Sequence, residues 1–406
     1  MHQGPGAQPL AKRVALCTIS LLFSACLDVT PDGTAIERPS AMPLSDHGDM
    51  GDGYEEDGTS SHYRPRTRTY FVAADEVDWD YAPDGYNVLM GRPFNSDENV
   101  FVEGNDHDRV GSIYRKVIYR EYEDGMFKSL KPRAEQDAYL GLLGPILHAV
   151  VGDTIRVVFK NNGSVPYSIH AHGVFYNKDS EGAATNDGTS IPDMVDDAVE
   201  PGKGHVYTWH VPERAGPGPA DPSSLAWLYH SHIEAGIADE YAGLIGAIIV
   251  TDAKHGTDSG FPSEVDREVV SLFMVMDENA SVFAEKNRKD RAPEAKPDDE
   301  EFEESNLMHT INGYVYGNGP RVTMRLGERV RWYLVSLGTE VDLHTPHWHG
   351  NTVLDHGHRT DVVELLPATM HTVDMLPDDP GIWMFHCHVN DHIAAGMSTL
   401  YEVCAD

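Results

Sequence analysis

The sequence predicts an all-β protein built from two β-sandwich domains, and three observations support this prediction. Strand-like runs such as Thr154–Phe159 recur along the chain. The 406 residues include 37 glycines and 25 prolines, which suits a fold with many turns. The chain also contains a degenerate internal repeat, because Gly152–Arg156 in the first half is matched by Gly327–Arg331 in the second. This length accommodates two or three domains.

The N-terminus predicts an exported protein. Lys12 and Arg13 precede a ten-residue apolar run, and Ser24-Ala25-Cys26 follows it. This pattern is typical of a secretory signal, and the run is shorter than the roughly 20 residues that span a membrane. Ser-Ala before cysteine resembles a bacterial lipobox, although Phe23 stands where leucine is usual. Residues 1–26 are therefore interpreted as a signal peptide, with lipidation of Cys26 or a plain secretory signal as alternatives, and the protein is expected in the periplasm or at the cell surface.

The remaining chain divides into segments by composition. Residues 27–66 are rich in Asp, Gly, Pro, Ser and Thr, and predict a disordered linker. Strand patterns then predict a first domain at 67–253 and a second at 266–404, with a polar break between them. The highly charged stretch 288–304 in the second domain is expected to be a loop.

Charge and cysteine content narrow the function classes. The formal net charge of −34 argues against nucleic acid as a partner, because phosphate binding needs a basic surface. It fits a soluble exported protein, or one that attracts cations. Of the four cysteines, Cys17 and Cys26 belong to the signal segment and Cys404 has no evident partner. The chain is therefore not a disulfide scaffold.

Paired histidines are the strongest metal signal in the sequence. Side chains at positions i and i+2 of a strand point to the same face, so a His-x-His pair presents two imidazoles to one metal site. Each half of the repeat holds two such pairs, which chance does not explain. The pairs are His170/His172, His230/His232, His347/His349 and His386/His388.

The last pair encloses a cysteine. Cys387, followed by His392 and Met397, supplies the thiolate, imidazole and thioether that are typical of a blue-copper electron-transfer site. Strand alternation turns Cys387 to one face, and His386 and His388 to the other. Two metal sites are thus expected to be joined through a few backbone bonds. Eight imidazoles suffice for three coppers, and with the fourth at Cys387 the chain could store the four electrons that reduce O₂ to water.

Further motifs accompany these histidines: Val77–Pro83, Tyr139–Ile146, Val211–Gly218, Asp277–Asn279, Met308–Gly313 and Gly381–Trp383. In this order the motifs resemble those of the multicopper oxidases, in particular the ceruloplasmin/hephaestin branch, over nearly everything after residue 66. The resemblance implies two cupredoxin-like Greek-key β-sandwiches, four coppers per chain and oxygen as the electron acceptor.

The resemblance also implies a role for each candidate ligand. Type 1 copper would be held by His344, Cys387, His392 and Met397, and type 2 copper by His170 and His347. The type 3 pair would use His172, His230, His232, His349, His386 and His388. Cys387, His386 and His388 would carry electrons between the centres.

Ser231 stands in the first domain where the second has Cys387, so the first domain is expected to lack a blue copper. The layout resembles two-domain members of the family that form trimers, in which the copper cluster lies between domain 1 of one subunit and domain 2 of the next. We therefore expect a homotrimer.

Fe(II) is the favoured electron donor. The ceruloplasmin family binds iron beside type 1 copper through carboxylates and one histidine. The similarity of the motifs assigns these ligand roles to Glu304, His309 and Asp391. Glu340, from the same chain or a neighbouring one, would be the fourth ligand. Hard oxygen ligands suit iron, and the acidic run 298–304 could attract cations.

The same residues are also compatible with other functions. A laccase-like phenol oxidase or a cuprous oxidase would use the same coppers, although no Met-rich segment is evident. A copper nitrite reductase needs one type 2 copper with three histidines, and an electron carrier needs no cluster. The sequence does not decide which acid relays protons, and the candidates are Asp179, Asp187 and Asp193. The three histidines His356, His358 and His371 lie outside any motif and are interpreted as surface or supporting residues.

Overall fold

Strands dominate the structure, and they form two pairs of sheets. The computed structural model describes residues 63–405, apart from residue 187 and residues 234–236. In the first pair the sheets have the strand orders β2-β1-β4-β6 and β3-β8-β7-β5. Their strands are β1 (Thr67–Asp80), β2 (Ile113–Tyr122), β3 (Leu147–Val150), β4 (Thr154–Asn161), β5 (His170–Ala171), β6 (Gly204–His210), β7 (Ser224–His230) and β8 (Ile245–Thr251).

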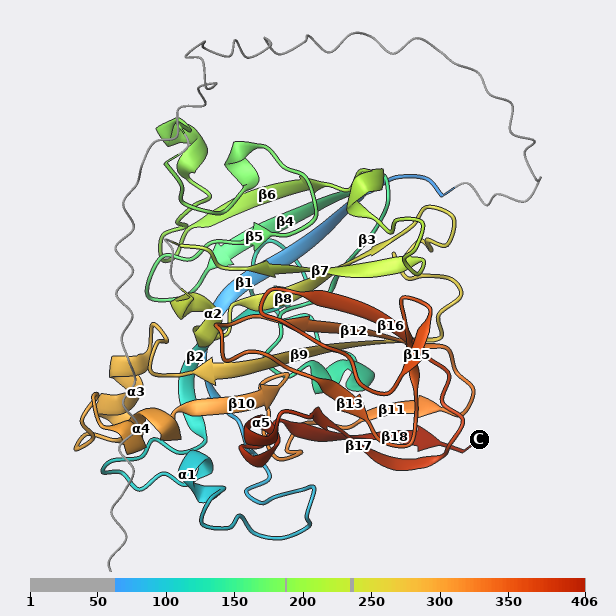
Figure 1. Cartoon of the computed structure of the whole chain (residues 1–406). Coiled ribbons are helices and arrows are strands. Elements are labelled where there is room, and N and C mark those ends of the chain that lie inside the picture. Colours follow the sequence, from blue (N-terminus) through green and yellow to red (C-terminus); the bar gives the residue numbers. More distant parts are fainter. Residues whose placement is uncertain (1–62, 187, 234–236, 406) are drawn as a thin grey trace, which may run out of the picture. The chain divides into compact units, whose positions relative to one another are not determined.

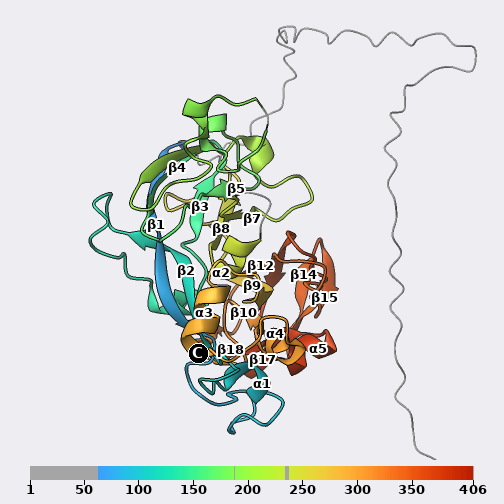
Figure 2. The ribbon, with the colours of Figure 1, turned by 90° about the vertical axis from the view of Figure 1, so that its left-hand side faces the viewer.

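The second pair repeats this arrangement. Its sheets have the orders β10-β9-β12-β16-β14-β15 and β11-β18-β17-β13. Their strands are β9 (Arg267–Asp277), β10 (Leu307–Ile311), β11 (Val322–Arg325), β12 (Val330–Ser336), β13 (Pro346–Trp348), β14 (Val353–Asp355), β15 (His358–Thr360), β16 (Met370–Met375), β17 (Gly381–Cys387) and β18 (Ser398–Cys404). Figures 1 and 2 show this pair, coloured from yellow at β9 to red at β18, below the first.

The internal repeat is confirmed strand by strand. β1 pairs antiparallel with β2 and parallel with β4, and β9 pairs in the same senses with β10 and β12. β8 lies between a parallel and an antiparallel neighbour, as does β18. The all-β, cupredoxin-like prediction is correct. Each sheet draws its strands from one side of the polar break, although the domain boundaries at 253 and 266 remain a prediction.

The charged stretch 288–304 is not a loop throughout, which corrects the sequence-based expectation. The helices of the structure are α1 (Asn99–Val102), α2 (Ala238–Ala242), α3 (Ala284–Arg291), α4 (Glu300–Ser305) and α5 (Asn390–Ala394). In α3, Glu285 pairs with Arg288 and Lys289 at i+3 and i+4, a spacing that stabilises a helix. At α4, the side chain of Asp299 caps the first turn by accepting from the backbone N–H of Phe302 at 3.2 Å.

The end of the predicted linker also contacts the fold. The Tyr63 hydroxyl and the backbone N–H of Arg66 both donate to the buried Asp153, each at 2.8 Å. Because both groups donate to the same carboxylate, residues 63–66 are held against the fold. The predicted signal peptide, its Cys26 and the rest of the linker lie outside the described residues. None of the described helices is long and apolar enough to cross a membrane.

A buried ion pair joins the two sheet pairs. Lys116 on β2 donates to Glu278, which follows β9, and both side chains are almost fully buried. The Lys116 ammonium also donates to the Tyr81 hydroxyl at 2.8 Å and to the Tyr241 carbonyl at 2.7 Å. The hydrophobic core around them draws residues from both pairs. Because a buried charge is stable only when it is paired, this contact fixes how the pairs meet.

Removing Lys116 should therefore cost much more than removing an exposed lysine. Lys116→Ala leaves the Glu278 carboxylate buried without its partner, so we expect a loss of about 3–5 kcal/mol in the free energy of unfolding. Lys131→Ala, which breaks the more exposed pair with Glu121, should cost below about 1 kcal/mol. Denaturant unfolding of the metal-free protein measures both, and equal losses would contradict the role given to Lys116.

Candidate metal centres

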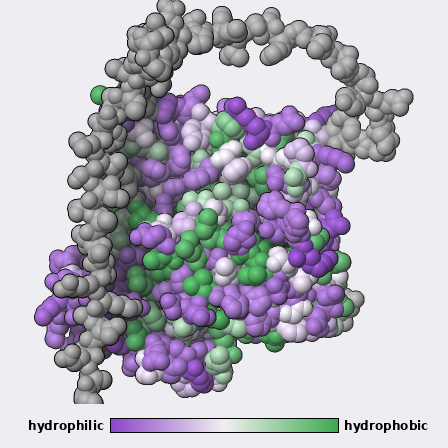
Figure 3. All heavy atoms as spheres, viewed as in Figure 1, coloured by the Kyte–Doolittle hydropathy of each residue, from purple (hydrophilic) through white to green (hydrophobic). Residues whose placement is uncertain are grey.

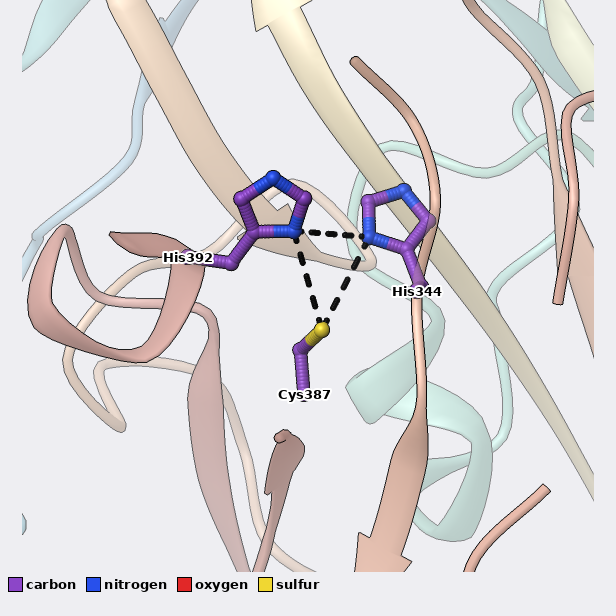
Figure 4. Close-up of side chains that lie close together, drawn as sticks. All are labelled: His344, Cys387 and His392. Atoms are coloured by element: carbon purple, nitrogen blue, oxygen red, sulfur yellow. Dashed lines mark hydrogen bonds between the residues drawn. The ribbon is translucent and has the colours of Figure 1, made fainter. Parts of the chain in front are cut away.

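One candidate metal centre, here called the Cys387 site, consists of His344, Cys387 and His392. Cys387 ends β17, His392 lies on α5, and His344 bridges to Leu365 in an isolated β-contact. The two Nδ1 atoms are 3.1 Å apart, and the Cys387 Sγ lies 3.9 Å from His344 Nδ1 and 3.6 Å from His392 Nδ1. Figure 4 shows the three donor atoms pointing toward one another. All three residues are buried, so together they can hold an ion away from solvent.

The surroundings favour the ligand form of the cysteine. Burial raises the pKa of the Cys387 thiol, but hydrogen bonds with His344 and His392 outweigh burial and lower the pKa to about 6. The thiolate is the form that binds metals. Met397 is fully buried, accepts from the Cys387 backbone N–H at 3.1 Å and donates to the His392 carbonyl at 2.9 Å. The backbone thus ties the predicted fourth ligand to two others.

Asp342 orients His344, a role that no sequence motif predicts. Its Oδ1 lies 3.2 Å from His344 Nε2 and accepts from the backbone N–H of Val275 at 2.7 Å, while its Oδ2 accepts from the backbone N–H of Thr339 at 2.9 Å. A carboxylate on the far nitrogen of a histidine ligand fixes the ring and leaves Nδ1 free for the metal. The only sequence signal was its position two residues before His344. Gly338 allows the close approach, since a Cβ there would lie 1.9 Å from Asp342 Oδ2.

The second histidine group comprises His347, His349, His386 and His388. β13 and β17 pair antiparallel so that His347 lies opposite His386. His386 Nε2 lies 3.2 Å from His347 Nδ1 and 3.1 Å from His349 Nε2, and the His388 ring is 5.3 Å from that of His347. His386 Nδ1 donates to the Cys387 carbonyl at 2.7 Å. This hydrogen bond directs Nε2 into the group and links it to the Cys387 site.

The first histidine group comprises His170, His172, His230 and His232, and it has the same plan. β5 and β7 pair so that His170 lies opposite His230. His172 Nε2 and His230 Nε2 are 3.0 Å apart, and the His232 ring is 5.2 Å from that of His170. His170 Nδ1 contacts the Glu181 carbonyl at 2.7 Å, and His230 Nδ1 lies 2.8 Å from Glu240. These contacts leave Nε2 of both rings available.

Burial keeps several of these imidazoles neutral. It is the largest cause that lowers the pKa of His172 and of His386 to about 4, and the neighbouring imidazoles lower it further. A neutral imidazole is the form that binds metal ions. The two groups remain separate, because in the described part of the chain no hydrogen bond or ring contact joins a member of one to a member of the other.

Ser231 stands in the first sheet pair at the position that Cys387 occupies in the second. It is fully buried, donates to Asp239 Oδ2 at 2.7 Å and accepts from the Ser168 backbone N–H at 3.2 Å. Burial is the main cause that raises the pKa of Asp239 to about 6. At the position that corresponds to Cys387, the first sheet pair thus has a serine whose side chain is fully engaged in hydrogen bonds.

The predicted iron ligands are only partly brought together. His309 on β10 is buried, with its ring 5.2 Å from that of His392, and burial is the main cause that lowers its pKa to about 4. Glu304 lies in the last turn of α4, Asp391 lies on α5, and Glu340 lies four residues before His344 in the chain. All three side chains are exposed. No group of three donors within 4.8 Å among the described residues includes any of these carboxylates.

The structure shows contacts to a histidine group for two acids other than the three named from the sequence. His205 Nε2 donates to the Asp179 carbonyl at 2.8 Å, and Asp193 accepts from Ser190 at 2.8 Å; Asp187 lies outside the described residues. Instead, Glu240 lies beside His230, and Asp361 Oδ2 lies 3.5 Å from His347 Nε2. Both acids come from other loops and helices, so spacing along the chain gave no signal for them.

Known protein families match the parts of the chain that carry these histidines and Cys387. Two multicopper oxidase family models match residues 140–255 and 290–405. The chain belongs to the multicopper oxidase family. It is 46% identical to Ferroxidase HEPHL1 of Homo sapiens over 83% of the chain, 40% identical to human hephaestin and 41% identical to human ceruloplasmin. It spans only 28–30% of the length of these three relatives.

Solved structures support the fold. A multicopper oxidase structure aligns with a TM-score of 0.52 at 20% identity, covering 83% of this chain and 89% of the other. A copper nitrite reductase from Nitrosomonas europaea aligns with a TM-score of 0.52 at 17% identity, covering 83% of this chain and 94% of the other. At these identities the structures establish the cupredoxin-like fold alone, while family membership implies copper as the cofactor.

Gly338→Ala should weaken metal binding at the Cys387 site through Asp342. The added Cβ collides with the carboxylate that orients His344, and loss of such a contact typically lowers metal affinity about 10- to 100-fold. Gly327→Ala is the matched control, because Gly327 also has a positive φ but has no atom within 4 Å of a Cβ. Copper titration monitored by the blue absorption band measures both. Equal affinity in the two variants would contradict the role of Asp342.

Proposed function

We propose that the chain is a multicopper oxidase that takes single electrons from Fe(II) and delivers them to O₂. The balanced reaction is four Fe(II), one O₂ and four protons giving four Fe(III) and two waters. The observation that carries this proposal is the junction at the end of β17, where Cys387 belongs to one metal centre and the adjacent His386 to another. Their 2.7 Å hydrogen bond gives a short connection between the two.

The donor sets fit copper. A thiolate with two imidazoles suits a blue-copper site, and the 3.1–3.9 Å separations of these donors suit one ion at bonds of about 2.0–2.3 Å. Bound copper would supply one-electron redox chemistry. His344, Cys387, His392 and Met397 would hold the type 1 ion, and His170 and His347 the type 2 ion. The type 3 pair would be held by His172, His230, His232, His349, His386 and His388.

The protein's own residues shape the path for electrons and protons. The Cys387 carbonyl accepts the Nδ1 proton of His386, which holds that ring in the tautomer with Nε2 free. Asp361 is more than half exposed and lies near His347, so it is placed to pass protons from solvent toward the oxygen-reducing site. Glu240 can hold the Nδ1 proton of His230.

We propose that the protein assembles as a homotrimer. A cluster of three coppers needs both histidine groups, and no contact between described residues joins them within one chain. Exposed apolar side chains also lie along the two segments whose isolated bridges join Leu365 to His344 and Val362 to His347, namely Val341, Leu343, Val362 and Leu366. Figure 3 shows hydrophobic residues gathered over the second sheet pair on the face of Figure 1. Such a surface is typical of an interface, and a neighbouring chain would bring the first group to it.

Iron is favoured as the donor by His309 and by the relatives. The His309 ring lies beside that of His392, so iron bound by His309, Glu304, Asp391 and Glu340 would sit next to the electron entry site. Because the three carboxylates are exposed, they can turn toward an arriving cation. The name of one relative, Ferroxidase HEPHL1, is consistent with this donor. We further propose that the protein is exported, with residues 1–26 as a signal peptide that is either a lipoprotein signal with Cys26 lipidated or a plain secretory signal.

A copper nitrite reductase is less compatible with the geometry, even though its fold is shared. It requires one type 2 copper with three histidines, whereas each sheet pair here gathers four imidazoles. A laccase-like phenol oxidase or a cuprous oxidase would use the same copper centres and differs only in the electron donor. The proposed iron ligands therefore distinguish these enzymes.

Mixing two inactive variants should restore activity if the cluster lies between subunits. His170→Ala/His172→Ala removes part of the first group, and His347→Ala/His349→Ala removes part of the second. In a cyclic trimer assembled from equal amounts of both, about a quarter of the interfaces carry two intact groups. O₂ consumption after unfolding and co-refolding should recover accordingly. No recovery, with trimers present on a sizing column, would place the cluster elsewhere.

Glu304→Ala and His309→Ala should reduce kcat/KM for Fe(II) by at least about ten-fold, equivalent to about 1.4 kcal/mol, because each removes an iron ligand. The rate with a dimethoxyphenol should change little, since that donor does not need these ligands. Glu301→Ala, another exposed glutamate on α4, is the matched control. An unchanged Fe(II) rate in both ligand variants would refute the iron site.

A further inference from the structure

A third cluster of metal-binding side chains lies at the β14–β15 hairpin, away from the sites described above. β14 ends at Asp355, which pairs with His358 across a two-residue turn. Both turn residues have positive φ, +46° at His356 and +78° at Gly357. Two-residue turns of this kind need positive φ at both positions and favour Asn-Gly, and histidine is one of the non-glycine residues that tolerate the left-handed region. The turn thus holds the imidazole of His356 beside Asp355 at the end of β14.

A neighbouring strand adds a second histidine. β14 and β16 pair so that Asp355 lies opposite Val373, and His371 is two residues from Val373 on the same face of β16. Asp355 Oδ1 lies 2.8 Å from His356 Nδ1 and 3.6 Å from His371 Nδ1. The two imidazole rings are perpendicular, with centroids 5.9 Å apart. All three donor atoms lie within 4.8 Å of one another.

Two of these donor atoms lack a satisfactory partner. Asp355 Oδ1 and His371 Nδ1 are inaccessible to solvent and make no well-aligned hydrogen bond with the described residues. A buried polar atom without a partner costs roughly 1–3 kcal/mol, so such atoms call for an explanation. An ion between the three donors would satisfy both atoms at once.

We propose that Asp355, His356 and His371 bind a divalent transition-metal ion, with Zn²⁺ as the best fit. Two imidazoles and one carboxylate form a typical zinc ligand set, with bonds of about 2.0–2.2 Å and a position left for water. The 3.6 Å separation between Asp355 Oδ1 and His371 Nδ1 agrees with donors that share one ion, and the exposed His356 would widen its 2.8 Å contact with Asp355 Oδ1 to admit the ion. No thiolate is present, which distinguishes this site from the Cys387 site. Of the three histidines first interpreted as surface or supporting residues, only the exposed His358 retains that role.

The ion would fasten the hairpin to β16. Figure 2 shows β14 and β15 at the margin of the second sheet pair, where β15 has β14 as its one partner in the sheet order of the described chain. The segment after β15 reaches the copper ligands, because Val362 bridges to His347 and Leu365 to His344. Zinc at the hairpin would thus stabilise the segment that borders both copper centres.

Zinc binding to the copper-loaded protein tests this site, because copper then occupies the other centres. Equilibrium dialysis should show one zinc ion per chain that His356→Asn/His371→Gln lacks, and each single change should weaken Kd at least about ten-fold. Asparagine suits the left-handed turn, so His356→Asn keeps the hairpin while removing the ligand. His358→Asn, on the same hairpin, is the matched control and should bind zinc as the unaltered protein does.

Thermal unfolding gives an independent readout. Zinc should raise the Tm of the unaltered protein and of His358→Asn, since a ligand that binds only the folded state stabilises it, and should leave the Tm of the double variant unchanged. The proposal is overturned if the double variant takes up as much zinc as the unaltered protein. A loss of zinc in His358→Asn equal to that in His356→Asn would overturn it as well.

Discussion

The alternation of side chains along β17 is the constraint on which both kinds of metal centre depend. Because successive side chains of a strand point to opposite faces, Cys387 enters the buried Cys387 site while His386 enters the second histidine group. The separation of the two centres is thereby set by one residue of backbone. The hydrogen bond from His386 to the Cys387 carbonyl completes the connection. No loop movement can separate the centres without breaking the strand.

Pairing of short strands then places the remaining imidazoles. β13 sets His347 opposite His386, and β5 sets His170 opposite His230. Each His-x-His pair lies at the end of a strand, where the second histidine can turn toward the metal. Contacts on the other ring nitrogen, such as Asp342 on His344 and Glu240 on His230, hold the rings in place. Bringing imidazoles together in a partly buried site also lowers the pKa of His172 and His386, so the groups are ready for metal at neutral pH.

The sequence predicted the fold class, the repeat and the grouping of the histidines, because these features depend on periodicity within a few residues. It failed where distant segments decide the outcome. The charged stretch around α3 and α4 lacks an apolar pattern, and its helices are stabilised by local ion pairs and a cap. Asp342, Glu240 and Asp361 reach their histidines through the fold, so their spacing carries no signal. His356 and His371 are fifteen residues apart and meet only because β14 pairs with β16.

Copper analysis of the protein with and without Cys387 tests most directly whether two metal centres are joined but distinct. The unaltered protein should hold four coppers per chain. Cys387→Ser should hold three and lose the blue absorption and the oxidation of Fe(II), because the histidine groups remain intact. Two coppers per chain in the unaltered protein would indicate a nitrite-reductase arrangement, and one would indicate an electron carrier. Either result, or full oxidase activity in Cys387→Ser, would contradict the account.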